Sequence, residues 1–188
     1  IELWRLNRCF ILLIHSLNPP PVMPSTKNPQ LQALIKGFES VYEGQPWYGS
    51  SMLASLKKMG PELITQSVIP GKKNIAALVR HIVAWRLFLI EHLKGNHSYH
   101  IELDTELDWP PVQGLGWEDL LEELAASQQT IIALLSGQED AILKKTLTHG
   151  KYEYSFRYLI EGVIQHDIYH LGQINLTRVL LEAQPSRQ

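Results

Sequence analysis

The stretch of sequence that decides both the fold and the site is residues 162–174, GVIQHDIYHLGQI. On a helix, the four-residue spacing of His166 and His170 places their imidazoles one turn apart on the same face. Burial of a titratable ring destabilises the fold unless the ring has a hydrogen-bond partner or a bond to a metal. One divalent metal can act as the partner of both rings. The alternative is an ordinary pair of core histidines that donate hydrogen bonds to carbonyl groups. The pair falls on an apolar stripe where a helix normally places leucine or isoleucine: Leu159, Val163, His166, His170, Ile174 and Leu181.

A third histidine, His81, belongs to another apolar segment, residues 74–90. It borders the inward face of that segment, so it can meet His166 and His170 if the two helices pack side by side. Three neutral imidazoles with open positions for water or substrate describe a catalytic metal site rather than a closed structural one. The inward face consists of Ile75, Leu78, Ile82, Trp85 and Leu89. The remaining histidines are interpreted as solvated or incidental: His15, His92, His97, His100 and His149.

Composition limits the classes of function that the chain can have. Its 188 residues are enough for one domain with a substantial core. A net charge of -2 gives no basic surface for nucleic acid. Cys9 is the only cysteine, which excludes an internal disulfide and a thiolate metal cluster and fits a reducing cytoplasm. Any bound metal must therefore have nitrogen or oxygen ligands.

Residues 1–24 differ from the rest of the chain. They carry two arginines before a short apolar run, and the triplet Pro19-Pro20-Pro21 follows without a small-residue cleavage site. The run is too short to span a bilayer, so no membrane association is expected. We expect a non-native or disordered leader, with the native product beginning at Met23; an export signal is the alternative. The domain then covers residues 25–184, and residues 185–188 form a tail.

Helix-capping residues and apolar periodicity divide the domain into helices. Asn28-Pro29 is typical of a helix start, and Asn74 and Ser155 are expected to cap the two segments that carry the histidines. Residues 96–116 have loop character, and the alternation over 144–154 indicates a short extended or hairpin piece. The pattern predicts an all-α four-helix bundle with a long crossover loop. The expected helices cover residues 29–43 and 52–59 (one broken arm), 75–94, 117–136 and 156–181.

Three motifs together resemble the DinB-like (YfiT-type) superfamily of metalloenzymes. They are the turn Pro46-Trp47-Tyr48-Gly49, His81 followed by Trp85, and the stretch HDIYHLGQI at 166–174. The resemblance covers roughly residues 28–181, and the last helix is its most specific part. It implies a four-helix bundle, often a homodimer, that binds one divalent metal, nickel or zinc, through His81, His166 and His170. Some members are thiol S-transferases that use low-molecular-weight thiols such as bacillithiol or mycothiol, so a small thiol is the implied co-substrate.

Three functions remain open at this point. The first is a metal-dependent thiol S-transferase with a small-molecule substrate. The second is a metal-dependent hydrolase that acts through a metal-bound water. The third is a non-catalytic metal-binding dimer of a stress response. None of them requires a protein nucleophile or a nucleic-acid partner, and all fit a cytoplasmic location.

Other residues near the expected ligands are weaker candidates. Gln173 lies three residues after His170 and is expected to donate or accept a hydrogen bond beside the metal, or to be an ordinary polar residue. Trp85, Trp47 and Tyr48 are expected to line a pocket over the metal, although aromatic residues of this kind more often belong to the core. By helical period, Asp167 and Tyr169 point away from the inner stripe and stay outside the expected site.

Overall fold

The computed structural model of the chain describes residues 28–149 and 152–184. The expected leader, with Cys9 and His15, and the tail lie outside these residues. Within the described residues, no helix has both the length and the apolar composition that crossing a membrane requires. The elements in chain order are α1 (Pro29–Tyr42), α2 (Met52–Leu56), α3 (Ile75–Leu93), α4 (Trp117–Ser136), the 3-10 helix η1 (Asp140–Lys144), β1 (Thr146–His149), β2 (Tyr152–Ser155) and α5 (Phe156–Glu182).

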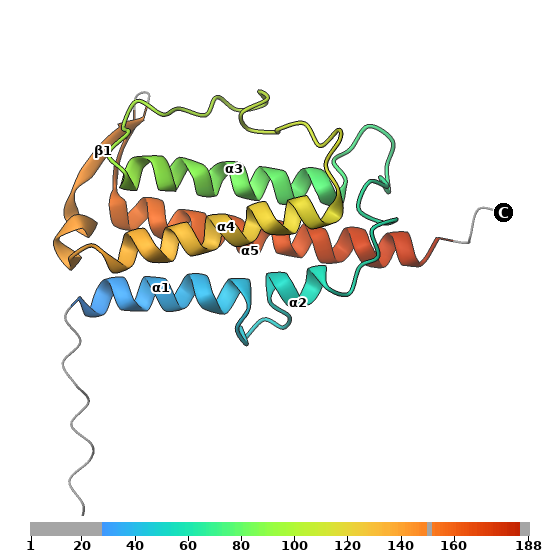
Figure 1. The fold of residues 1–188 in the computed structure, drawn as a ribbon, viewed down its shortest axis with the longest axis horizontal. Coiled ribbons are helices and arrows are strands. Elements are labelled where there is room, and N and C mark those ends of the chain that lie inside the picture. Colours follow the sequence, from blue (N-terminus) through green and yellow to red (C-terminus); the bar gives the residue numbers. More distant parts are fainter. Residues whose placement is uncertain (1–27, 150–151, 185–188) are drawn as a thin grey trace, which may run out of the picture.

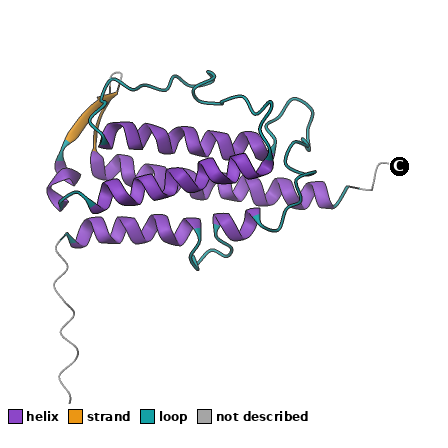
Figure 2. Cartoon of the chain, in the orientation of Figure 1, coloured by secondary structure: helices purple, strands orange, loops and turns teal. Residues whose placement is uncertain are grey.

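The helices form an all-α bundle, as the sequence predicts. α3 packs against α4 and α5, and α1 packs against the same two helices, while the short α2 continues the α1 side (Figure 1). α1 and α2 are therefore the two halves of one broken arm. The only strands in the described part of the chain form the two-stranded hairpin β1-β2, which lies at one end of the bundle (Figure 2). This hairpin confirms the extended piece expected over residues 144–154.

The long crossover loop is the connection between α3 and α4. It covers residues 94–116 and runs back along α3, so that α3 and α4 point in the same direction (Figure 1). Two adjacent helices can be parallel only if the connection returns along their whole length. The loop consequently covers α3 on the side away from α1, where it contributes residues to the candidate site.

Side-chain caps fix the starts of the two helices that carry the histidines. Asn74 Oδ1 accepts a hydrogen bond from Ala77 N at 2.9 Å, and Ser155 Oγ accepts one from Tyr158 N at 3.2 Å. Both caps were predicted. Asn28 behaves differently, because it adopts a left-handed conformation (φ 68°) and makes no side-chain cap to α1. Asp140 replaces it and accepts hydrogen bonds from two backbone N–H groups of the first turn, those of Gln30 and Leu31, at 3.1 and 2.9 Å.

The core consists of two large apolar clusters separated by a polar layer, and of a smaller third cluster formed by Ala84, Phe88 and Ile101. One cluster contains α2 and the first half of α3, and it includes Leu171 and later residues of α5. The other contains α1 and the end of α3, and it includes α5 only as far as Val163. The interval between the two large clusters holds four buried polar residues: Arg86 on α3, Ser127 and Gln128 on α4, and Asp167 on α5. The same interval on α5 contains His166 and His170, so the polar layer of the bundle is where the candidate site lies.

Candidate metal centre

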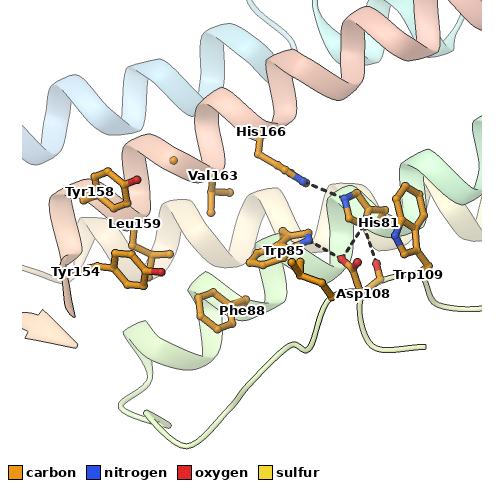
Figure 3. A pocket seen from close by; sticks show the side chains of 12 residues that line it. His81, Trp85, Phe88, Asp108, Trp109, Tyr154, Tyr158, Leu159, Val163 and His166 are labelled. Carbon is orange, nitrogen blue, oxygen red and sulfur yellow. Dashed lines mark hydrogen bonds and ion pairs between the residues drawn. The ribbon is translucent and has the colours of Figure 1, made fainter. Parts of the chain in front are cut away.

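The three predicted histidines meet at one point between α3 and α5. His166 Nε2 lies 3.1 Å from His81 Nε2 and 3.0 Å from His170 Nε2. One ligand nitrogen from each ring lies within 4.8 Å of the other two. His81 and His170 are buried and His166 is partly buried. Figure 3 shows the rings of His81 and His166 pointing toward each other from their two helices. The expectation that a histidine of the 74–90 segment meets the pair on the last helix is confirmed.

Hydrogen bonds on the outer side of two rings set their tautomers. His81 Nδ1 lies 2.7 Å from the backbone carbonyl oxygen of Asp108, which can only accept, so Nδ1 carries the proton and donates. His170 Nδ1 donates to Gln173 Oε1 at 2.7 Å in the same way. In a neutral imidazole the proton on Nδ1 leaves the lone pair on Nε2. Both rings therefore present a lone pair to the point where the three Nε2 atoms converge.

His166 cannot satisfy both of these lone pairs. If its proton is on Nε2, it can donate to only one of the two neighbouring Nε2 atoms. If its proton is on Nδ1, three lone pairs face one another, and Nδ1 itself is buried with no hydrogen-bond partner among the described residues. Unsatisfied buried polar atoms are costly. A cation that accepts all three lone pairs removes this deficit, so the residues present fit a divalent metal.

The protonation state of the three rings also suits a metal. Burial, followed by the neighbouring His170, His81 and Arg86, lowers the pKa of His166 to about 3. Burial lowers the pKa of His81 as well, against the opposing effects of the Asp108 carbonyl and carboxylate. Burial likewise lowers the pKa of His170, and its hydrogen bond to Gln173 acts in the opposite direction. All three rings are thus neutral at pH 7, which is the form that binds metal ions.

Asp108 in the crossover loop connects the site to α3. Its carboxylate Oδ1 accepts a hydrogen bond from Trp85 Nε1 at 2.9 Å and lies 3.1 Å from His81 Nδ1. Its Oδ2 accepts from Asp104 N at 3.0 Å. The next residue, Trp109, stacks on the His81 ring with a centroid distance of 3.9 Å and an interplanar angle of 8°. These two residues were missed by the sequence analysis; their only signal is an acidic and an aromatic residue just before Pro110-Pro111.

A cavity of about 440 Å³ opens beside the histidines. His81 and His166 lie at one end of it, and Trp85 and Phe88 on α3 form one wall (Figure 3). Trp85 therefore lines a pocket at the site, as predicted. Trp47 does not, because its side chain is fully exposed, and Tyr48 is 44% exposed and does not line this cavity. Both lie in the surface turn between α1 and α2, so their assignment to the pocket was wrong.

Asp167 was expected to point away from the interior, and this was wrong. Its side chain is fully buried, and its Oδ2 accepts hydrogen bonds from Arg86 Nε at 3.0 Å and Nη2 at 2.8 Å. Burial raises the pKa of this carboxyl group, and the Arg86 guanidinium acts in the opposite direction. The physical reason is that α5 contacts α1 as well as α3, so more than one of its faces is covered. Tyr169, in contrast, is exposed as expected.

Among the side chains that the structure describes, no other histidine takes part in the centre. His97 and His100 are exposed, in agreement with the sequence analysis. His92 is buried, which corrects its interpretation as solvated. Its Nδ1 donates to the carbonyl oxygen of Phe88, one turn earlier, at 2.8 Å. His149 belongs to β1.

The comparisons with known proteins agree with this geometry. The sequence model of the DinB superfamily matches residues 49–174, a range that contains all three histidines of the cluster and the crossover loop. No curated protein and no solved structure matched the chain.

Proposed function

Because the chain belongs to the DinB superfamily, we propose that it binds one divalent transition metal, nickel or zinc, through His81, His166 and His170. The observation that carries this proposal is the convergence of three Nε2 atoms, two of which have their outer nitrogens already hydrogen-bonded. Metal-binding histidines commonly have their second nitrogen held in this way. Imidazole ligands suit nickel and zinc, and they also suit copper and iron.

The residues around the cluster hold its rings in the orientation and protonation state that a metal ion requires. The Asp108 carbonyl and the Gln173 amide orient two of the rings, and burial keeps all three in the neutral form. Trp109 covers one face of the His81 ring. When bound, a divalent cation at three nitrogen ligands acts as a Lewis acid and lowers the pKa of a coordinated water or thiol. The cavity beside His81 and His166 gives a small molecule access to this point.

We propose further that the chain is an S-transferase for a low-molecular-weight thiol. In this reaction the thiol sulfur forms a bond to an electrophilic carbon, the bond from that carbon to its leaving group breaks, and the thiol proton passes to solvent. No protein nucleophile is needed, and the residues that line the cavity include no cysteine, serine or lysine. The protein's part is to hold the thiol and the electrophile close together and to exclude water.

Two other functions give different results in the same experiments. A metal-dependent hydrolase would cleave an activated ester without any added thiol. A non-catalytic metal-binding protein would take up metal and be stabilised by it, with no turnover in either assay. The homodimer implied by the resemblance stays a prediction, which sedimentation velocity tests directly.

The first experiment measures metal content in protein purified without a histidine tag. We expect about one equivalent of nickel or zinc in the wild type and a large loss in His81→Ala and His166→Ala. His97→Ala, an exposed histidine outside the cluster, is the matched control and should keep its metal. The second experiment supplies a small thiol and an activated aryl chloride, and only the metal-loaded wild type and the control should form the thioether. Absence of metal in the wild type after reconstitution would refute the proposal.

A further inference from the structure

The candidate metal centre depends on how α5 is placed relative to α3. His166 and His170 both belong to α5 and move together, whereas His81 belongs to α3. His81 Nε2 lies 3.1 Å from His166 Nε2 across the interface between the two helices. Metal–nitrogen distances in proteins vary by only about 0.2 Å, so a shift of α5 by about 1 Å would separate one ligand from the other two.

The outer hydrogen bonds of the three rings do not fix this placement. His81 donates to the Asp108 carbonyl oxygen in the crossover loop, and His170 donates to Gln173 on its own helix. His166 Nδ1 is buried and has no hydrogen-bond partner among the described residues. Neither of the two outer hydrogen bonds runs between α3 and α5, so they leave the distance between the two helices open.

A buried ion pair, Arg86 with Asp167, joins the two helices directly. Asp167 is the residue next to His166 on α5, and Arg86 is on α3. Both side chains are fully buried, and Arg86 Nε and Nη2 donate to Asp167 Oδ2 at 3.0 and 2.8 Å. Apolar packing between helices is non-directional and tolerates small shifts, whereas a hydrogen bond requires a narrow range of distance and angle. The pair therefore fixes α5 against α3 at a point one residue away from a metal ligand.

The Arg86 guanidinium is itself held from the other helices. Its Nη1 donates to Ser127 Oγ at 3.2 Å and to the Leu124 carbonyl oxygen at 3.4 Å, both on α4. The centroid of the Tyr42 ring on α1 lies 5.7 Å from Arg86 Cζ. A guanidinium is planar and its donors have fixed directions, so contacts of one edge with α4 also fix the edge that faces Asp167. α4 is thus the reference against which Arg86 holds α5.

We infer that Arg86 is a positioning residue of the metal centre, which acts through Asp167 to hold His166 at bonding distance from the ion. This inference rests on the proposed function. The pair has no net charge, so attraction of a cation does not explain such a role. The charge of Arg86 disfavours a cation at the site, since it adds to burial and the neighbouring histidines in lowering the pKa of His166. Loss of the pair would leave metal affinity unchanged or raise it if the role were electrostatic, and lowers it if the role is positioning.

The experiment measures the affinity of the full chain for cobalt(II) by competition with a chelator, together with the visible absorption spectrum, which depends on the number and arrangement of the ligands. Arg86→Met/Asp167→Leu removes the pair as a unit and leaves no charge behind. We expect its affinity to fall about 10–100-fold, the range for groups that orient metal ligands, and its spectrum at saturation to differ from that of the wild type. The matched control is Arg80→Met/Glu123→Leu, which removes the ion pair next to His81 that joins α3 to α4 instead. The control should bind cobalt(II) as the wild type does.

A second variant keeps the charges constant and is decisive if the apolar variant does not fold. Arg86→Lys retains the positive charge but replaces the planar fork by a shorter side chain with one nitrogen, so cobalt(II) affinity should fall by about tenfold. Addition of Asp167→Glu lengthens the acid and should restore part of this loss. Affinity within about threefold of the wild type in Arg86→Met/Asp167→Leu, or in Arg86→Lys if the first variant is unfolded, would overturn the inference alone. A wild type that binds no cobalt(II) would refute the proposed function, and the inference with it.

Discussion

The buried pair of Arg86 and Asp167 gives the most quantitative prediction. Both side chains have no exposed surface, and two hydrogen bonds from the guanidinium end on one carboxylate oxygen. Asp167→Ala removes the carboxylate and leaves the guanidinium in the core with two weaker contacts, Ser127 Oγ at 3.2 Å and the Leu124 carbonyl oxygen at 3.4 Å. Removal of one partner of a buried pair costs about 3–5 kcal/mol in the free energy of unfolding. This is a large part of the total of about 5–15 kcal/mol typical of a domain.

Replacement of both partners should cost far less. In the double variant Arg86→Met/Asp167→Leu no charge is left in the core, and Ser127 Oγ keeps its own hydrogen bond to the Leu124 carbonyl oxygen at 2.7 Å. Buried ion pairs replaced by apolar residues of similar volume are often neutral or more stable. The double variant should therefore be more stable than Asp167→Ala, although it carries one substitution more.

Urea unfolding followed by circular dichroism at the helix band measures both effects. With a slope of about 2 kcal/mol per M, a loss of about 4 kcal/mol lowers the midpoint of Asp167→Ala by about 2 M. The midpoint of the double variant should lie near that of the wild type. A midpoint for Asp167→Ala within about 0.5 M of the wild type would refute the reasoning, because the cost would then be only about 1 kcal/mol. A double variant less stable than the single one would refute it as well.

Three further predictions concern the site and its surroundings. The pKa of His166 is about 3 in the folded chain, against the ordinary value of 6.5 that applies to the unfolded chain. Between these two pH values the unfolded state therefore binds more protons than the folded state. Metal-free protein should thus lose up to about 1.4 kcal/mol of stability per pH unit from this histidine as the pH falls below about 6.5, as urea titrations would show. Gln173→Leu removes the acceptor for His170 Nδ1 and should weaken metal affinity by about 10–100-fold in competition with a chelator, with little change in stability after metal removal. Trp47→Ala should leave thermal stability and metal affinity unchanged, because the side chain is fully exposed, and a change in either would show that Trp47 has a contact outside this chain.

Much of the fold could be predicted because it depends on local chemistry. The caps Asn74 and Ser155 and the apolar periods of the long helices act within one or two turns of the chain, so sequence alone exposes them. The meeting of His81 with His166 and His170 could also be predicted, since each residue lies on the inward side of its own helix. Asn28 shows the limit of this reasoning. The cap of α1 comes from Asp140, more than a hundred residues away, and no local pattern marks such a partner.

The parts of the site that escaped prediction depend on packing between distant segments. Asp167 lies at the border of the histidine stripe on α5, and the sequence analysis treated this position as exposed. It is buried because α5 is covered from two directions, by α1 and by α3. The prediction for Trp47 was wrong in the opposite direction, since it was expected in the pocket and is exposed. An aromatic residue in a turn does not indicate whether the turn folds over the site or away from it. Both errors concern long-range packing rather than secondary structure.

The crossover loop is the part of the chain where fold and site depend most on each other. A loop of this length is needed because α3 and α4 are parallel, and its path along α3 brings Asp108 to His81 and Trp85. One residue thereby fixes the tautomer of a histidine, and its neighbour Trp109 covers the ring of that histidine. A loop of the same length that followed another path would keep the pair on α5 but would remove the acceptor that directs the His81 lone pair inward. The long connection is therefore a functional segment of the centre. The helices supply the three imidazoles, and the loop supplies the hydrogen-bond acceptor and the aromatic ring that orient His81.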